Sequence, residues 1–273
     1  MREKKKTSLK RTKKKQSLYR PMPTWQRMIL AVLMVSLFAF LFYWYGVRPY
    51  AYRWKPCYGF QGYGVCLPSD YHIHGFDLSH HQGSVDWCYL AANCNPLFPL
   101  RFVFIKATEG TDLADEAFDT NFAQAREKGF LRGAYHYFKP KSDPLLQADF
   151  FIRRVALQSG DFPPVLDVEE RGRLNKAEFQ TRVKQWLDRV EAHYHVTPIL
   201  YSGYKFRKKY LNDTIFNRYP FWIAHYYADS VSYQGPWHFW QHTDVGRLPG
   251  IDKAVDLNIF RGTEEQLQAL TIR

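Results

Sequence analysis

The sequence lacks the short motifs that most often indicate phosphate, dinucleotide or serine-nucleophile chemistry. It contains no GxSxG, no Walker-type glycine-rich loop and no GxGxxG. Because each of these motifs serves a defined mechanism, their absence removes the commonest signals for serine hydrolases, phosphoryl transfer and dinucleotide binding. Any catalytic chemistry has to be sought among carboxylates, histidines and cysteines.

Cysteine is scarce, with four residues among 273 and none before residue 57. Their spacings do not resemble the CxxC pattern of a zinc site, which stands as the alternative to disulfides. Nearest-neighbour pairing, Cys57 with Cys66 and Cys88 with Cys94, is preferred among the three possible connectivities. Disulfides would place this part of the chain outside the cytoplasm.

Histidines form one cluster. Four of the ten lie within ten residues: His72, His74, His80 and His81. HxH and HH pairs occur in metal sites, but no further ligand pattern accompanies these, and a loop histidine more often lies at the surface or makes a hydrogen bond. We therefore predict no metal and no cofactor.

A charge excess is absent from most of the chain, despite a formal net charge of +12. Residues 1–27 hold eleven Lys or Arg against one acidic residue, so the other 246 residues carry 27 basic and 25 acidic side chains. The basicity therefore belongs to a terminal tail. Without that tail nothing is basic enough to hold a nucleic acid, and we predict no nucleic-acid partner.

One long apolar run follows the tail. Residues 28–45, MILAVLMVSLFAFLFYWY, contain no charged side chain, and a helix of this length spans about 27 Å, close to the thickness of a bilayer core. A cleavable signal peptide is the alternative, but the run ends in aromatic residues rather than a small-residue cleavage site. We predict an uncleaved transmembrane anchor at residues 28–46. The positive-inside rule then makes residues 1–27 a cytoplasmic tail and places the chain from about residue 47 outside the cytoplasm.

Beyond the anchor, strands and helices are predicted to alternate. Residues 47–70 are rich in Gly, Pro and Tyr and are predicted to be a linker that closes into a small loop. Strands are predicted at residues 74–81, 101–108, 133–138, 163–169, 198–203, 221–226, 238–243 and 254–260. Helices are predicted at residues 115–128, 143–158 and 175–194 and from Thr263 onward. This alternation favours one α/β domain at residues 71–273, a closed TIM-barrel-like (β/α) barrel of eight strands. The last loops are too short for crossover helices, which predicts an irregular final part.

Acidic residues lie at the ends of the predicted strands. Asp77 is in the first strand, Glu109 follows the second, Asp167 and Glu169 are in the fourth, and Asp256 is in the eighth. The carboxyl ends of barrel strands share one mouth, where active sites of this architecture are found. We therefore expect these carboxylates to converge.

Asp167 and Glu169 are two residues apart on a predicted strand. Their side chains would project to the same face, roughly 6–7 Å apart at the backbone. Two such carboxylates can hold different protonation states, one as an acid and one ionised, as glycosidic cleavage requires. An isolated DxE would indicate a solvated turn, whereas its place at the end of the apolar FPPVL segment favours an active site.

Six segments, in order, resemble glycoside hydrolase family 25, the muramidase-type lysozymes. They are GFDLSHHQGSVDW at 75–87, FVFIKATEGTDLADEAFDTNF at 102–122, GAYHYF at 133–138, PPVLDVE at 163–169, FWIAHY at 221–226 and FWQHTDVGRLPGIDKAVDLNIF at 239–260. They cover nearly all of residues 74–262, so the resemblance is far more specific than any one motif.

The resemblance implies a flattened barrel that cleaves the β-1,4 bond between N-acetylmuramic acid and N-acetylglucosamine in peptidoglycan. It places the general acid on Glu169. The family's other acidic positions fall on Asp77, Asp167 and Asp256, and its groove-lining aromatic positions fall on Tyr135, Tyr137, Tyr201 and Trp222. Lys106 and Glu109 lie in the KATEG segment, where a buried ion pair is as consistent as a catalytic role.

The resemblance also implies a retaining reaction. Either the substrate's acetamido group attacks the anomeric carbon, oriented by Asp167, or Asp77 stabilises that carbon directly. The alternatives are a wall amidase or peptidase, and a non-catalytic peptidoglycan-binding module on the same barrel. Family members are usually secreted with cell-wall-binding repeats, whereas this chain shows no repeat and carries an apolar segment. We expect a membrane-anchored enzyme of a bacterial inner membrane whose barrel faces the periplasm.

Overall fold

The computed structural model describes residues 22–48, 57, 60–226 and 228–273, which belong to two units divided after Pro56. In the first unit, helix α1 (Thr24–Phe42) continues as the π-helical segment η1 (Tyr43–Val47). Thr24–Val47 has a mean hydropathy of 2.2, and none of its apolar window is buried. By length and composition this helix could cross a membrane, a test that a signal sequence also passes. The rest of the predicted tail, residues 1–21, lies outside the described residues.

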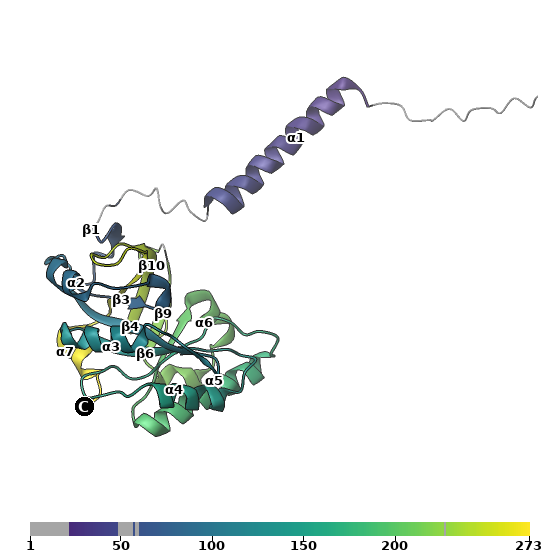
Figure 1. The fold of residues 1–273 in the computed structure, drawn as a ribbon. Helices are drawn as coiled ribbons and strands as arrows, with labels where there is room; N and C mark the ends of the chain where they lie inside the picture. The colour runs from purple at the N-terminus through teal and green to yellow at the C-terminus, as the bar shows by residue number, and fades with distance from the viewer. Residues whose placement is uncertain (1–21, 49–56, 58–59, 227) are drawn as a thin grey trace, which may run out of the picture. The chain divides into compact units, whose positions relative to one another are not determined.

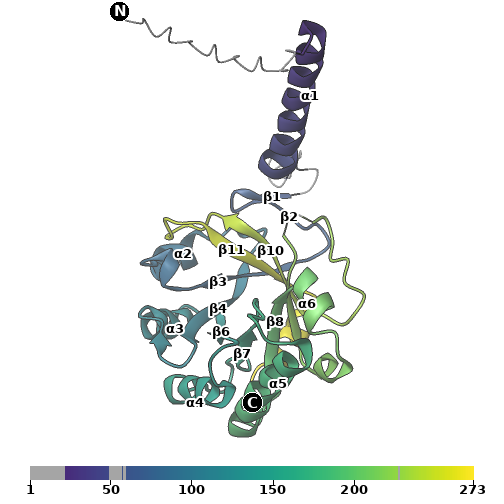
Figure 2. The same cartoon turned by 90° about the vertical axis from the view of Figure 1, so that its right-hand side faces the viewer.

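The second unit, Cys57–Arg273, is built on a closed barrel (Figures 1 and 2). The eight barrel strands are β3 (Ile73–Leu78), β4 (Leu100–Glu109), β6 (Leu131–Tyr137), β7 (Val165–Asp167), β8 (Ile199–Gly203), β9 (Phe221–Ala224), β10 (Phe239–Gly246) and β11 (Val255–Phe260). They pair in that order, and β11 pairs with β3 to close the ring. The short strand β5 (Leu113–Ala114) pairs only with the end of β4. The predicted eight-stranded barrel is confirmed.

The last strand runs against all the others. Neighbouring strands from β3 through β10 are parallel, whereas β11 is antiparallel to both β10 and β3. The connection between β10 and β11 is too short for the crossover helix that a parallel strand needs. This confirms the predicted irregularity. It also places the first residues of β11, rather than its last, at the mouth formed by the carboxyl ends of the other strands.

Helices surround the barrel, and local signals in the sequence fix where they begin. They are α2 (Trp87–Asn93), α3 (Phe118–Glu127), α4 (Pro144–Arg154), α5 (Lys176–Tyr194), α6 (Tyr204–Tyr210) and α7 (Glu264–Ala269). Asp143 caps α4 by accepting hydrogen bonds from two backbone amides, and Asn175 caps α5 by accepting one from the amide of Glu178. The two helices pack together, with the rings of Phe151 and Trp186 5.5 Å apart.

Large aromatic side chains fill the inside of the barrel. Phe102, Phe104 and Phe239 are fully buried, with ring centroids 5.1–5.7 Å apart. Two glycines make room for them, since a Cβ on Gly75 would lie 2.5 Å from Phe102 and a Cβ on Gly133 would lie 2.6 Å from Phe104. This packing uses part of the 18% of residues that are Phe, Trp or Tyr. It also closes the barrel interior, so that a ligand can enter only at the ends.

A small hairpin packs on the barrel within the segment predicted as a linker. Strands β1 (Phe60–Gly62) and β2 (Val65–Leu67) are antiparallel, and a disulfide joins Cys57 to Cys66. Leu67 is buried in the main core, and the Tyr63 hydroxyl donates a hydrogen bond to the carbonyl of Phe98. The compact unit therefore begins at Cys57, inside the region 47–70.

The predicted bond between Cys88 and Cys94 is wrong. Cys88 lies exposed on helix α2, and Cys94 follows the helix with its thiol donating to the carbonyl of Leu90. Residues six apart on a helix are turned by roughly 240° around its axis, so they cannot face one another. Both thiols are free.

We expect Cys66→Ser to lower the free energy of unfolding by about 2–3 kcal/mol, the loop entropy that a bond across about ten residues removes from the unfolded chain. Cys88→Ser is the matched control, because that thiol is exposed and unbonded. Urea unfolding of the full chain in detergent, followed by tryptophan fluorescence, measures both. Equal stability of the two variants would show that the hairpin bond contributes nothing.

Candidate active site

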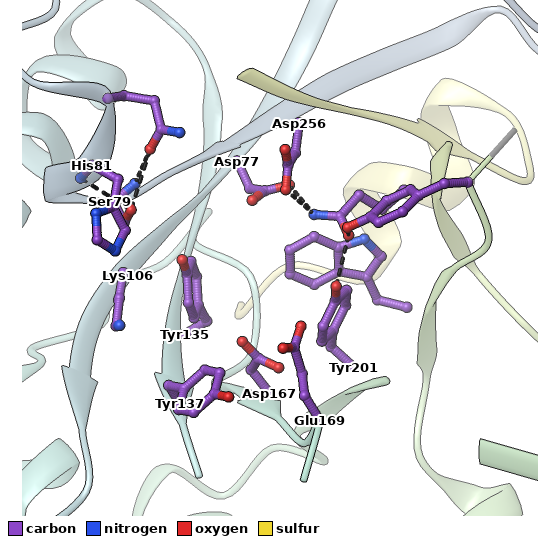
Figure 3. A pocket seen from close by; sticks show the side chains of 14 residues that line it. Asp77, Ser79, His81, Lys106, Tyr135, Tyr137, Asp167, Glu169, Tyr201 and Asp256 are labelled. Carbon is purple, nitrogen blue, oxygen red and sulfur yellow. Dashed lines mark hydrogen bonds between the residues drawn. The ribbon is translucent and has the colours of Figure 1, made fainter. Parts of the chain in front are cut away.

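One cavity of about 260 Å³ opens at the mouth where the carboxyl ends of the parallel strands meet (Figure 3). All eight residues that the sequence singled out as catalytic or substrate-binding line it. They are Asp77, Asp167, Glu169, Asp256, Tyr135, Tyr137, Tyr201 and Trp222. The expected convergence of carboxylates is therefore present in the structure.

The barrel strands explain why four distant acidic residues meet here. Asp77 is the second-last residue of β3, Asp167 ends β7, and Glu169 lies two residues beyond it. Asp256 reaches the same mouth from the opposite direction, because it is near the start of antiparallel β11. Its direct strand partner is Asp77. Figure 3 shows these two side chains together, across the cavity from Asp167 and Glu169.

Asp77, which is buried, and Asp256, which is partly exposed, form a carboxylate pair. The Gln241 amide donates to both, at 2.8 and 2.9 Å, and the Asn258 amide donates to Asp77 at 2.8 Å. Burial raises the pKa of Asp77 despite these hydrogen bonds, and burial together with the charge of Asp77 raises the pKa of Asp256. Two such neighbours titrate as a unit, and the first proton is released more easily than the second.

Asp167 and Glu169 differ in their surroundings. Asp167 is 7% exposed, and its Oδ1 atom has no hydrogen-bond partner among the described residues. Burial raises its pKa well above the ordinary value, and the charge of Glu169 adds to the shift. The Glu169 side chain is exposed toward the cavity, yet the surrounding protein removes enough water from its carboxyl to raise the pKa. The Tyr201 hydroxyl and the positive charge of Lys106 lower this pKa and so oppose the shift. Both groups therefore favour the protonated form more than a carboxyl in water does.

The aromatic residues differ in how they meet the cavity. Trp222 is only 2% exposed and forms part of the floor, where its indole donates to Asn258 and its ring stacks on Phe104 at 4.5 Å. Tyr135 and Tyr137 are partly exposed along one wall. The Tyr201 hydroxyl donates to Gln241 at 2.7 Å. Because Tyr201 is only 4% exposed, a substrate would contact Tyr135 and Tyr137 more fully than Tyr201 or Trp222.

Lys106 and Glu109 form an ion pair at 2.5 Å, and Lys139 reaches the other Glu109 oxygen at 2.9 Å. The two lysines lower the pKa of Glu109 in spite of its partial burial. Lys106 lines the cavity, whereas Glu109 does not. Of the two roles left open for Glu109, the structure favours the ion pair.

Two of the four clustered histidines, His80 and His81, lie near the cavity mouth but do not form a metal centre. Nδ1 of His80 lies 2.8 Å from buried Asp115, and the ring of His81 lies beside that of His80. Over the residues that the structure describes, no group of three or more His, Cys, Asp or Glu side chains is placed to hold a metal ion.

The sequence reasoning missed several residues of the cavity. Gln241, Tyr226, Gln82, His81 and Ser79 line it, and Asn258 lies behind Asp77. Asn258 could have been found, because it is two residues after Asp256 on a strand and so faces the same side. The inward direction of Gln241 had a similar signal, because it is two residues after the apolar Phe239 on a strand, but its hydrogen-bond partners come from other strands and had none.

We expect Asp256→Asn to stabilise the fold at neutral and alkaline pH. The pKa of Asp256 is raised in the folded chain. From about pH 4 upward the unfolded chain therefore loses the Asp256 proton while the folded chain keeps it, so the free energy of unfolding falls as pH rises. The variant should exceed the parent by about 1–3 kcal/mol at pH 8, with the gap closing toward pH 4. Urea unfolding at both pH values measures this. A variant less stable than the parent at pH 8 would show that the charge of Asp256 is well accommodated.

Comparison with known proteins agrees with this geometry. Residues 76–251 match the family model described as "Glycosyl hydrolases family 25". The chain is 44% identical over 228 residues to "Uncharacterized protein YegX" of Escherichia coli O157:H7, covering 83% of this chain and 80% of that protein. It is 32% identical over 213 residues to "Lysozyme M1" of Streptomyces globisporus, covering 72% and 71% of the two chains.

Solved structures give the same result. The family 25 glycosyl hydrolase of Bacillus anthracis superposes with a TM-score of 0.67 at 31% identity, covering 74% of this chain and 95% of that one. The family match at residues 76–251 includes Asp77, Asp167 and Glu169 and ends before Asp256. The chain therefore belongs to glycosyl hydrolases family 25 and is a glycoside hydrolase.

Proposed function

We propose that this chain is a muramidase that hydrolyses the β-1,4 bond between N-acetylmuramic acid and N-acetylglucosamine in peptidoglycan. The observation that carries the proposal is the meeting of Asp167 and Glu169 with the Asp77 and Asp256 pair in one cavity at the barrel mouth. Relatives of the chain include a lysozyme and N,O-diacetylmuramidases. Tyrosines along the cavity wall provide flat surfaces for sugar rings.

Glu169 is the general acid in this proposal. It opens toward the cavity, and its raised pKa favours the protonated form before catalysis. Its proton passes to the glycosidic oxygen as the bond between that oxygen and the anomeric carbon breaks. The resulting carboxylate then takes a proton from the incoming water, so Glu169 ends the cycle protonated.

Asp167 assists the step in which the substrate's 2-acetamido oxygen attacks the anomeric carbon. The amide nitrogen gains positive charge during this attack. That charge favours the ionised form of Asp167 in spite of its burial, and the carboxylate in turn stabilises the charge. The Oδ1 atom of Asp167 suits this role because it has no partner among the described residues and can accept a hydrogen bond from the N–H of the acetamido group. Water then replaces the acetamido oxygen from the opposite face, so the configuration is retained. Asp77 as direct stabiliser of the anomeric carbon is the competing assignment.

The test of the function is the kind of bond that breaks. Digestion of insoluble peptidoglycan by the full chain in detergent should release soluble fragments with new reducing ends and no new free amino groups. New amino groups would indicate an amidase or peptidase. Binding of peptidoglycan without release of fragments would indicate a non-catalytic module on the same barrel.

We further propose that α1 anchors the chain in a membrane with residues 1–27 in the cytoplasm and the barrel on the other side. The eleven basic residues among residues 1–27 and the disulfide beyond the apolar helix support this orientation. Protease treatment of spheroplasts should degrade the barrel and spare the tail. Degradation of the tail alone would reverse the orientation.

A further inference from the structure

We propose that Gln241 is a positioning residue that holds Asp77 and Asp256 together against their repulsion and ties them to Tyr201 and Tyr226 across the cavity. The inference rests on the proposed function, because it assigns a role within the same site. Gln241 is not acidic, yet its side chain forms hydrogen bonds with four cavity side chains at once.

The Gln241 side chain uses every hydrogen-bonding position that it has. Its Nε2 atom donates to Asp77 at 2.8 Å and to Asp256 at 2.9 Å, while its Oε1 atom accepts from Tyr201 at 2.7 Å and from Tyr226 at 2.6 Å. An amide has two hydrogens and two acceptor positions, so no capacity is left over. With 2% of its surface exposed, the side chain has no water to replace a lost partner.

The chemistry of the neighbours fixes which way the amide points. Ionised carboxylates can only accept hydrogen bonds, whereas tyrosine hydroxyls can donate. Turning the amide over would place its oxygen against two carboxylates and its hydrogens against two hydroxyls. The observed orientation is therefore the one that the four partners require.

The strand that carries Gln241 is shaped for this contact. Between Gln241 and Thr243 the pairing of β10 with β11 shifts register, so one extra residue is accommodated there. Such bulges often lie beside active sites. Gln241 itself keeps its regular pairing with Asn258, and because it is two residues after Phe239, which faces the barrel interior, it points to the same side. It there reaches Asp77 and Asp256 on β3 and β11, Tyr201 on β8, and Tyr226 just beyond β9.

The consequence for the carboxylate pair is electrostatic. The two hydrogens of one amide stabilise the negative charge that the pair carries once its first proton is lost, and so lower the cost of placing two carboxyl groups side by side. The hydrogen bond from Gln241 lowers the pKa of Asp77 against the effect of burial. Removal of Gln241 should therefore make the pair hold its proton to higher pH.

Gln241→Leu tests this inference in the full chain in detergent. We expect the pH midpoint of the buried carboxyl band in infrared titration to rise by about one unit. With peptidoglycan as substrate, kcat should fall about 100-fold while KM changes by less than about threefold, because misplaced groups slow the chemical step more than binding. Gln241→Glu keeps the shape of the side chain but removes both donated hydrogens, so it should raise the midpoint further. This variant replaces Gln241→Leu in the test if the leucine variant does not fold.

Gln147→Leu is the matched control. Gln147 is fully buried and also uses both ends of its amide, donating to the carbonyls of Lys139 and Ser142 and accepting from the Lys139 amide, but it lies outside the cavity. Its loss should lower stability without moving the infrared midpoint. An unmoved midpoint in both Gln241 variants, with no larger loss of kcat than in the control, would overturn the inference. The infrared titration needs no turnover, so a parent without muramidase activity would refute the proposed function and leave this test intact.

Discussion

Glu169→Gln should lower kcat on peptidoglycan by about 1,000-fold, the usual size of a general-acid contribution. The amide has the shape of the acid but no proton to give to the leaving oxygen. KM should change little, because the side chain at the open side of the cavity contributes to proton transfer rather than to the bulk of binding. Release of soluble fragments over time, at several substrate concentrations, separates the two constants.

Glu170→Gln is the control for this variant. Glu170 is the next residue, it is exposed, and it does not line the cavity. Among the described residues, Glu170 forms one ion pair, a 3.5 Å contact with Lys139. Turnover should therefore stay within about twofold of the parent, since exposed pairs contribute little. Equal losses in the two variants would mean that the charge of this segment matters but that Glu169 is not the acid.

Asp167→Asn should lower kcat by about 100-fold or more, because the neutral amide cannot stabilise the positive charge that develops on the substrate's acetamido group. Folding should not suffer. The carboxyl is buried, its pKa is raised, and one oxygen lacks a partner, so the neutral side chain removes an unfavourable charge. A loss of turnover with unchanged or higher thermal stability is the expected combination.

Asp77→Asn separates the two mechanisms when it is measured beside Asp167→Asn. If the acetamido group is the nucleophile, the Asp167 variant loses the most turnover and both variants still give a product of retained configuration. Essentially unimpaired turnover in Asp167→Asn would exclude the assisting role. A dominant loss in the Asp77 variant would assign stabilisation of the anomeric carbon to Asp77 instead.

Much of the fold could be predicted because its signals are local. Apolar runs of strand length recur between amphipathic segments, and Asp143, Asn175 and Thr263 mark helix starts with cap residues. The convergence of Asp77 and Asp167 followed from the architecture, since parallel barrel strands end at one mouth. Chain order and strand polarity were enough for those residues.

Other features depend on contacts between distant segments. The antiparallel direction of β11 brings Asp256 to the cavity from the start of its strand. The short loops of the sequence predicted an irregular end of the barrel, but they did not show that the last strand is antiparallel. Cys88 and Cys94 are near in sequence but turned apart by helix α2. The role of Gln241 depends on hydrogen bonds to four side chains from distant segments, which no pattern within its own strand specifies.

The most direct test of the account is the identity of the sugar at each new chain end. Purified peptidoglycan is digested with the full chain or with Glu169→Gln, and the released fragments are reduced and analysed by mass spectrometry. The account predicts reducing N-acetylmuramic acid from the parent and almost none from the variant. New ends that carry N-acetylglucosamine, cleaved peptides with intact glycan, or equal release by the two proteins would contradict it.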